Sequence, residues 1–397
     1  MNRREWFEQT STVAVAAGLL TYAGVACSED KQKKVRLAVA GGNFGATFSF
    51  HQHPNCVVSA VTDLLPERRD RLRAAYHCDV AYDSLEELLK KEKSVDAVAL
   101  FTDAPLHVKH ALMCFERGLH VLSAVPACTS VEEAQQLKEA KEKTGLRYMM
   151  AETSYYRPSC IYARNYFEQG HFGELFYSEA EYYHDKGNLQ ALNTNKHTRF
   201  WGPDGKHSWR WGYPPMHYPT HALGFLVGVT DERVTEVSCL GWGTKHEYLT
   251  DNVYENPYWN ETALMRTNRG HAHRANVFWL VGGDGERATW YGDRATVLDE
   301  NGSRHGPLLQ VRSQGARRLV FPEYYRSDML PEAMRHNATH GNSEVFISAE
   351  FINALVQNRE PAIDIYRSLA MTVPGLVAHQ SALKGGEQLK VPQFDRG

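Results

Sequence analysis

VRLAVAGGNFG (35–45) and CVVSAVTD (56–63) are the stretches that decide the fold of this chain. They predict an apolar strand over 35–40, a glycine turn over 41–45, a helix, a second apolar strand over 56–62, and an acid at the end of that strand. Glycines let the backbone approach a pyrophosphate, a helix N-terminus supplies N–H groups, and an acid about 20 residues further on binds ribose hydroxyls. This order predicts a dinucleotide site, and the alternative is a tight turn in an ordinary α/β domain.

Strand and helix signals then alternate up to residue 151. Buried-strand runs cover 96–101, 120–123 and 147–151. Capping boxes, Ser84-x-x-Glu87 and Ser130-x-x-Glu133, begin two of the helices between them. Such alternation is typical of a doubly wound parallel sheet. We therefore expect an α/β, Rossmann-type nucleotide-binding domain over residues 34–152.

The pattern changes in the second half of the chain. Strand-like runs recur there at 175–183, 234–240, 275–281 and 287–291, and the first of them has one polar face. Two helices are expected near the end, at 344–357 and 369–383. This pattern predicts an α+β domain over 153–397 with a large, mainly antiparallel open sheet and closing C-terminal helices. The aromatic-rich loop over 184–219 is long enough to suggest a functional segment.

The first 33 residues read as an export signal and a linker. Arg3-Arg4 and Trp6-Phe7 precede an apolar run over 13–26 that is too short to span a bilayer. The paired arginines resemble a twin-arginine signal, which predicts a periplasmic protein. Lipid anchoring at Cys27 is the alternative. No later segment is apolar for long enough to cross a membrane.

Composition narrows the classes of partner. Forty-four basic residues against 47 acidic ones give a net charge of −3, so no basic face for nucleic acid is expected. Seven scattered cysteines without a Cys-x-x-Cys pair argue against a disulfide framework and a structural zinc site. Twenty tyrosines, eight tryptophans and 19 histidines suit a carbohydrate site, because such rings stack on sugars and bind hydroxyls; an aromatic core is the alternative.

Further motifs carry a resemblance to a known family. They are Thr102-Asp103-Ala104-Pro105-Leu106-His107, the segment GLHVLSAVP (118–126), Trp209-Arg210 and His221. Together with the glycine turn they resemble the Gfo/Idh/MocA oxidoreductases, the glucose–fructose oxidoreductase and inositol dehydrogenase superfamily. The resemblance covers the chain after residue 33. It implies an NAD(P)-binding Rossmann domain, a sheet-faced substrate domain, a homodimer or homotetramer formed through that sheet, and a sugar or cyclitol substrate.

The resemblance also implies which residues contact the cofactor. Two registers of the glycine motif are open, Ala40-x-Gly42-x-x-Gly45 and Gly41-x-Asn43-x-x-Ala46. The carboxylate of Asp63 would repel a 2′-phosphate, which favours NAD over NADP. The full set of expected cofactor contacts is Gly41, Gly42, Asn43, Phe44, Gly45, Asp63, Thr102, His107 and Pro126.

The chain departs from the family at two catalytic positions. Val125 stands where the family usually has a lysine, and His217 where it usually has an aspartate. His221 remains as the expected acid/base, and Glu152, at the end of a predicted strand, is a candidate replacement acid or substrate anchor. The candidate catalytic residues are thus His221, His217 and Glu152, and the candidate substrate contacts are Tyr156, Arg157, His184, Trp209 and Arg210.

No metal is predicted, although one alternative stays open. His217 and His221 are four residues apart, which is the spacing of a zinc pair on one helical face. Pro219 lies between them and is expected near the start of the helix, which would separate the pair. Glu181 or His184 would supply a third ligand.

The predicted function is that of an exported, NAD-dependent oxidoreductase acting on a sugar, glycoside or cyclitol. Free NAD is not supplied outside the cytoplasm, so we expect the cofactor to be tightly bound and the overall reaction to be able to run without net redox change. Two alternatives stay open. One is a glycoside hydrolase or lyase that uses transient oxidation or a metal, and the other is a catalytically impaired carbohydrate-binding homologue.

Overall fold

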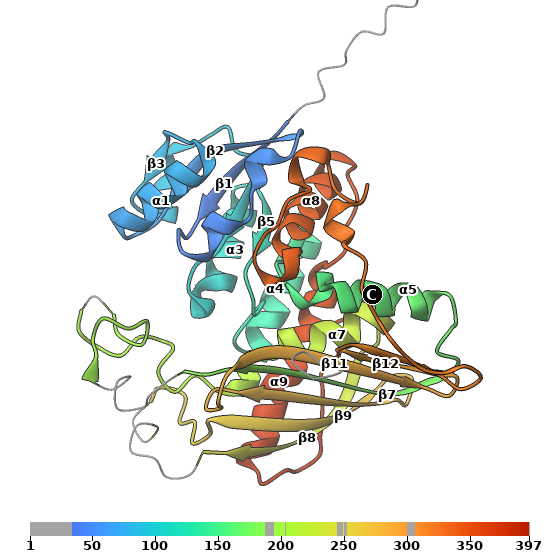
Figure 1. Ribbon diagram of the computed structural model, residues 1–397. Helices are drawn as coiled ribbons and strands as arrows, with labels where there is room; N and C mark the ends of the chain where they lie inside the picture. Colours follow the sequence, from blue (N-terminus) through green and yellow to red (C-terminus); the bar gives the residue numbers. More distant parts are fainter. Residues whose placement is uncertain are drawn as a thin grey trace, which may run out of the picture. The chain divides into compact units, whose positions relative to one another are not determined.

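The computed structural model describes residues 34–186, 194–202, 204–243, 249, 252–299 and 306–396. The predicted export signal therefore lies outside the described residues. Lys34–Gly397 forms one compact unit that contains two sheets (Figure 1). The boundary predicted at residue 152 separates these sheets in the sequence, and the division into two domains stays a prediction.

The first sheet has six strands in the order β3-β2-β1-β4-β5-β6, all parallel. Its strands are β1 (Val35–Ala40), β2 (Cys56–Thr62), β3 (Ala81–Tyr82), β4 (Ala97–Leu100), β5 (His120–Ser123) and β6 (Tyr148–Met150). Its helices are α1 (Pro66–Tyr76), α2 (Leu85–Lys91), α3 (His107–Glu116) and α4 (Val131–Thr144). Strand order reverses between β1 and β4, which is where open α/β sheets bind ligands. The doubly wound fold is confirmed.

The expected capping boxes form as predicted. Ser84 Oγ accepts from the backbone N–H of Glu87, and Ser130 Oγ accepts from that of Glu133, each at 3.1 Å. Each glutamate reaches back to a backbone N–H, at Asp83 and Thr129. These reciprocal bonds satisfy amides that a helix start leaves without partners.

The prediction of a helix directly after the glycine turn is wrong. Two single-turn 3-10 helices, η1 (Phe44–Thr47) and η2 (Phe50–Gln52), occupy its place. Ser49 between them takes a left-handed conformation with φ 53°, and the rings of Phe48 and Phe50 stack on each other at 5.6 Å. Aromatic side chains at this spacing bury best when the backbone turns back on itself, since they do not fall on one face of an α-helix. The dipole of a long helix is therefore not available at the turn.

The second sheet has nine strands in the order β14-β13-β12-β11-β7-β10-β9-β8-β15. All its pairings are antiparallel except that of β7 with β10. The strands are β7 (Leu175–His184), β8 (Val234–Trp242), β9 (Asn260–Thr267), β10 (Ala272–Phe278), β11 (Asp284–Gly292), β12 (Ala295–Asp299), β13 (Leu308–Val311), β14 (Gly315–Arg318) and β15 (Leu389–Lys390). The mainly antiparallel sheet is confirmed.

Helices cover one face of this sheet. α7 (Thr220–Thr230) packs on β7, and α9 (Ile365–Leu383) packs on β8 (Figure 1). α5 (Pro158–Glu168) packs on α7, and α8 (Ser343–Val356) packs on the short helix η4 (Ser154–Tyr156). Along β7, Ser178 and Ala180 are buried on the covered face. Because strand side chains alternate, Tyr182 and His184 continue that row.

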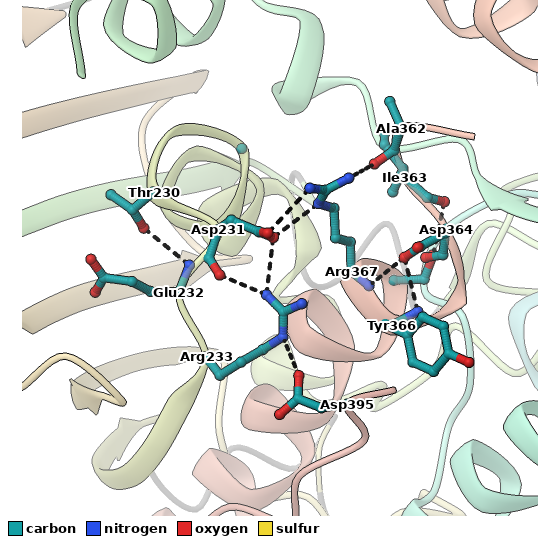
Figure 2. Close-up of polar contacts among 12 residues, drawn as sticks. Thr230, Asp231, Glu232, Arg233, Ala362, Ile363, Asp364, Tyr366, Arg367 and Asp395 are labelled. Atoms are coloured by element: carbon teal, nitrogen blue, oxygen red, sulfur yellow. Dashed lines mark hydrogen bonds and ion pairs between the residues drawn. The ribbon is translucent and has the colours of Figure 1, made fainter. Parts of the chain in front are cut away.

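A polar network ties the end of α7 to the start of α9 (Figure 2). Asp231 follows α7 in a left-handed conformation with φ 55°. Its two carboxylate oxygens accept from Arg367 at 2.9 and 3.1 Å, and Oδ1 also accepts from Arg233 at 3.1 Å. Asp364 caps α9 by accepting from the backbone N–H groups of Tyr366 and Arg367. Two helices that are far apart in the sequence are thus joined at their ends.

None of the helices in the described part of the chain has the length and apolarity needed to cross a bilayer. The cysteines in that part are buried free thiols.

Candidate functional site

The glycine turn lies at the carboxyl edge of the parallel sheet and is tightly packed. Gly41 has φ 103°, and a Cβ there would lie 2.2 Å from the carbonyl oxygen of Phe101. A Cβ on Gly42 would lie 2.1 Å from the carbonyl oxygen of Arg68, and one on Gly45 would lie 2.7 Å from the Phe101 ring. Because Gly42 and Gly45 both lack room for a side chain, the geometry supports the Ala40-x-Gly42-x-x-Gly45 register.

Asp63 holds this turn in place. Its Oδ2 accepts from the backbone N–H of Gly42 at 2.6 Å, and its Oδ1 accepts from that of Leu65 at 2.9 Å. Within the described residues, the backbone N–H groups of Asn43, Phe44 and Gly45 donate to no protein acceptor. Free amide donors beside an acid at the end of β2 fit a dinucleotide pyrophosphate and ribose.

The next predicted cofactor residues are largely committed to the protein itself. The ring of His107 is buried between two carbonyl oxygens, with Nδ1 2.8 Å from that of Pro126 and Nε2 3.0 Å from that of Thr102. The hydroxyl of Thr102 bonds to Nδ1 of His110 at 2.9 Å. His107 therefore joins the loops after β4 and β5, and it supports the carboxyl edge of the parallel sheet without being free to bind a nucleotide itself.

Glu152 and His221 form a buried dyad. Glu152 follows β6 at the same sheet edge, and His221 lies in the first turn of α7. His221 Nδ1 donates to Glu152 Oε1 at 2.8 Å, and the same oxygen accepts from the backbone N–H of Ser154 at 2.8 Å. The Glu152 side chain is fully buried, so it orients His221 and does not itself reach a substrate. Among the described residues nothing bonds to His221 Nε2, which is the nitrogen that faces outward from the dyad.

The dyad shifts both pKa values in the direction of an ion pair. Burial alone would raise the pKa of the Glu152 carboxyl, but the facing His221 and its hydrogen bond outweigh it, so the pKa lies below the ordinary 4.5. Burial alone would lower the pKa of His221, but Glu152 outweighs it, so that pKa lies above 6.5. A carboxylate on Nδ1 fixes the tautomer that leaves Nε2 free to take a proton.

An aromatic pocket opens beside the dyad. The Tyr182 ring lies 4.4 Å and the Tyr218 ring 5.2 Å from the His221 ring, centre to centre. Both tyrosines line a pocket whose walls are largely aromatic. The rest of the described lining is His184, Lys186, Arg199, Phe200, Trp209, Arg210, Gly212, Tyr213, Leu249, Tyr258, Trp259 and Trp279.

Three of the expected substrate contacts meet in this pocket, and two do not. His184, Trp209 and Arg210 all line it. Tyr156 is buried and stacks on Phe346 at 5.7 Å. Arg157 makes a two-pronged ion pair with Glu286, at 3.0 and 2.8 Å, so its guanidinium is already engaged.

Lys186 is a pocket residue that the sequence pattern did not bring out. It lies two residues past His184 and continues the row of side chains that includes Tyr182 and His184 on β7. Its Nζ lies 3.8 Å from the centre of the Trp279 ring. Alternation extended past the end of the strand would have found it. The family lysine position, by contrast, is a buried Val125 that makes no polar contact through its side chain.

His217 does not join the dyad. It ends the short helix η5 (Pro215–His217), whereas α7 begins at Thr220. Its ring packs at 5.0 Å against that of His379, and burial lowers its pKa to about 3. His379 is held in turn by Glu261, with 2.8 Å between Nδ1 and Oε1. The described residues contain no group of three side chains suited to hold a metal ion.

Comparison with known protein families matches two segments. Residues 35–152 match the model of the oxidoreductase family with an NAD-binding Rossmann fold, GFO_IDH_MocA. Residues 327–397 match the C-terminal domain of glycosyl hydrolase family 109.

Individual relatives cover nearly the whole chain or about a third of it. A glycosyl hydrolase family 109 protein from Streptomyces coelicolor is 24% identical over 98% of this chain and 92% of its own length. An alpha-N-acetylgalactosaminidase from Bacteroides fragilis is 36% identical, over 33% of this chain and 30% of its own. The solved structure of a levoglucosan dehydrogenase with NADH and levoglucosan is similar over 91% of this chain and 100% of its own, with TM-score 0.74 and 15% identity.

The sheet edge with the glycine turn, the dyad and these matches lead to one conclusion: residues 35–152 match the NAD-binding Rossmann domain of the Gfo/Idh/MocA oxidoreductases, and the chain as a whole is similar to glycosyl hydrolase family 109 proteins.

Proposed function

We propose that this oxidoreductase acts on a CH–OH group of a carbohydrate, with His221 as the acid/base. The observation that carries the proposal is the Glu152–His221 dyad at the edge of the nucleotide-binding sheet, beside an aromatic pocket. β6, which leads to Glu152, lies three strands from β1, so the dyad is about 15 Å along the edge from the glycine turn. That distance suits a dinucleotide laid across the edge, with its pyrophosphate at Gly42 and its reactive ring near His221.

The residues of the chain divide the work as follows. The glycine turn and Asp63 would hold NAD⁺, which would supply the acceptor for the hydride that leaves the sugar carbon as the CH–OH group becomes a carbonyl. His221 Nε2 takes the hydroxyl proton, and Glu152 stabilises the imidazolium that results. Tyr182 and Tyr218 hold the sugar against His221 and keep water from the ring. In the reverse direction His221 returns the proton to the carbonyl oxygen.

We further propose that NAD, rather than NADP, is bound and that it stays bound through turnover. Asp63 at the end of β2 supports the first point because its carboxylate would repel a 2′-phosphate. The twin-arginine-like N-terminus supports the second, since a periplasmic enzyme receives no free NAD. The test is to denature the purified protein, identify the released nucleotide, and screen a panel of sugars for its reduction. Protein without stoichiometric nucleotide would refute tight binding, and released NADP would refute the cofactor preference.

A second candidate is glycoside cleavage through transient oxidation. The match of residues 327–397 to the family 109 C-terminal domain favours it, as does the full-length similarity to a family 109 protein. The same dyad would serve, because oxidation and reduction of the same carbon leave no net redox change. Cleavage of 4-nitrophenyl glycosides without accumulation of NADH would support it. Net NADH formation without cleavage would assign the protein to simple dehydrogenation.

We propose that the open face of the second sheet forms a homo-oligomer. Leu240 and Trp242 on β8 and Leu264 on β9 are 65%, 54% and 57% exposed. The register places Leu240 opposite Thr262 and Ser238 opposite Leu264, so these side chains share one face. Such a patch on a sheet face is typical of a protein–protein contact. Light scattering should show a dimer or tetramer, and Leu240→Asp with Leu264→Asp should yield monomers. A monomeric parent protein would contradict the proposal.

A further inference from the structure

The pocket beside the dyad is basic. Lys186, Arg199 and Arg210 line it, and the described lining contains no Asp or Glu. None of these three side chains has an ion-pair partner among the described residues. Asp284 lies near them, but its Oδ1 is 2.6 Å from Nδ1 of His184 and accepts from the backbone N–H of Asp185 at 2.8 Å.

Two of these groups pack on aromatic rings that also line the pocket. Nζ of Lys186 lies 3.8 Å from the centre of the Trp279 ring, and the Arg210 guanidinium lies 4.2 Å from that of Trp209. Burial, then the guanidinium groups of Arg199 and Arg210, lower the pKa of Lys186 to about 6. Like charges repel one another in a partly dry pocket, and no described residue supplies a counterion to these three. A bound anion would remove this repulsion and would accept hydrogen bonds from all three side chains.

We propose that the pocket recognises an anionic sugar, whose carboxylate, sulfate ester or phosphate ester is held by Lys186, Arg199 and Arg210 while its ring stacks on the neighbouring tryptophans. This inference rests on the proposed function for the statement that the ligand is a sugar. The anionic group provides the specificity, because its ion pairs with the three basic side chains orient the sugar in the pocket. One hydroxyl of the sugar then lies next to His221.

The test measures binding, without turnover, to the full purified protein with its nucleotide. Matched probes share one ring and differ only at carbon 6: methyl glucuronide, methyl glucoside 6-sulfate, methyl glucoside 6-phosphate and methyl glucoside, with the corresponding galactose series. Isothermal titration should show at least about 10-fold tighter binding of one charged probe than of its neutral counterpart, since hydrogen bonds to charged groups are stronger than those between neutral groups. The probe that binds tightest identifies the anion.

Two variants localise the effect. Lys186→Met and Arg210→Gln should each weaken the charged probe about 10-fold and change the neutral one little. Lys196→Met is the matched control, because Lys196 also lies over a tryptophan, 5.3 Å from the Trp201 ring centre, but does not line the pocket. It should bind as the parent protein does.

Proton uptake gives an independent readout. The charged groups that act on Lys186 are Arg199, Arg210, His184 and Asp284. An anion added to this set raises the pKa of Lys186, so binding at pH 7.5 should take up a proton. Titrations in buffers of different ionisation heat measure that uptake, and Lys186→Met should abolish it.

The outcomes separate the two proposals. Equal or tighter binding of the neutral probe, or no binding of any charged probe, overturns the anionic subsite while nucleotide release still decides the proposed function. Selective, Lys186-dependent binding of a charged probe by protein that releases no NAD upholds the subsite and refutes the proposed use of the cofactor.

Discussion

Replacing Glu152 with glutamine separates the charge of the dyad from its shape. Glutamine has the same size, and its amide oxygen can still accept from His221 Nδ1 and from the backbone N–H of Ser154. Both bonds now end on a charged oxygen, at 2.8 Å each. Hydrogen bonds to charged groups contribute roughly 1 kcal/mol more than neutral ones, so Glu152→Gln should lower the free energy of unfolding by about 2 kcal/mol.

The loss should depend on pH in a defined way. In the folded protein the pKa of Glu152 is below 4.5 and that of His221 above 6.5. The lowered carboxyl pKa adds stability above 4.5 that is lost as pH falls through the folded value, and the raised imidazole pKa adds stability below 6.5 that is lost as pH rises through its folded value. Urea unfolding should therefore show the largest effect of Glu152→Gln between pH 4.5 and 6.5, and a smaller one at pH 9.

Activity should change with it. Without the carboxylate, burial lowers the pKa of His221, so the acid limb of kcat/KM should move to lower pH. The rate itself should fall by about 100-fold, because a neutral amide oxygen on Nδ1 stabilises the imidazolium that forms during the reaction less than a carboxylate does. NMR titration of the His221 ring, assigned with His221→Asn, follows the same shift without a substrate.

A matched control lies nearby in the same protein. Glu261 is also fully buried and accepts from a histidine Nδ1, that of His379, and from a backbone N–H, that of Met216. Glu261→Gln should destabilise the protein without moving the acid limb of activity. A Glu152→Gln protein that keeps the parent rate and acid limb, with a pH-independent loss of stability, would refute the reasoning.

Three further perturbations test the fold around the site. Gly42→Ala should lower the free energy of unfolding by about 2 kcal/mol and abolish nucleotide retention, because its Cβ would lie 2.1 Å from a carbonyl oxygen. Gly282→Ala is the control and should do neither, because nothing lies within 4 Å of its Cβ. Thermal melting and the amount of nucleotide released on denaturation measure the two effects. Ser130→Ala should cost about 1 kcal/mol in urea unfolding by removing a helix cap, and an unchanged midpoint would exclude the cap's contribution. Arg367→Ala should cost about 1 kcal/mol near neutral pH. Burial would raise the pKa of Asp231, but Arg367 and Arg233 hold it below 3.8, so this loss should disappear as pH falls through the folded value, and a loss that persists in acid would contradict the assignment.

The parallel sheet could be predicted almost residue by residue, and the antiparallel one less well. Strands buried on both faces read as continuous apolar runs, so β1, β2 and β5 begin and end where the sequence predicts. β3 in the parallel sheet and β9 and β12–β15 in the other escaped prediction, because very short strands and strands with one open face are hard to distinguish from loops. α9 begins at Ile365, earlier than expected, because Asp364 caps it with its side chain.

The site was partly predictable for a related reason. Glu152 could be named from its position at the end of a strand, where open α/β sheets bind ligands, whereas His221 was named from the family resemblance. Their mutual bond joins residues 69 positions apart, which no local pattern reveals. The engagement of Arg157 with Glu286 and of His107 with two carbonyl oxygens has the same origin, because the partner strand or loop is distant in the sequence.

The network around Asp231 has a mechanical consequence for the imidazole at the other end of the same helix. α7 has 11 residues, so the ion-pair network at Asp231 and the His221 ring are separated by a helix about 16 Å long. A rotation of the helix axis by only about 2° about its Asp231 end would move the His221 ring by about 0.6 Å. This displacement exceeds the tolerance of about 0.5 Å for productive catalytic geometry. The rigidity of the ion-pair network at Asp231 therefore determines how precisely His221 is positioned. Weakening that network should increase the positional spread of the imidazole without changing any residue that lines the pocket.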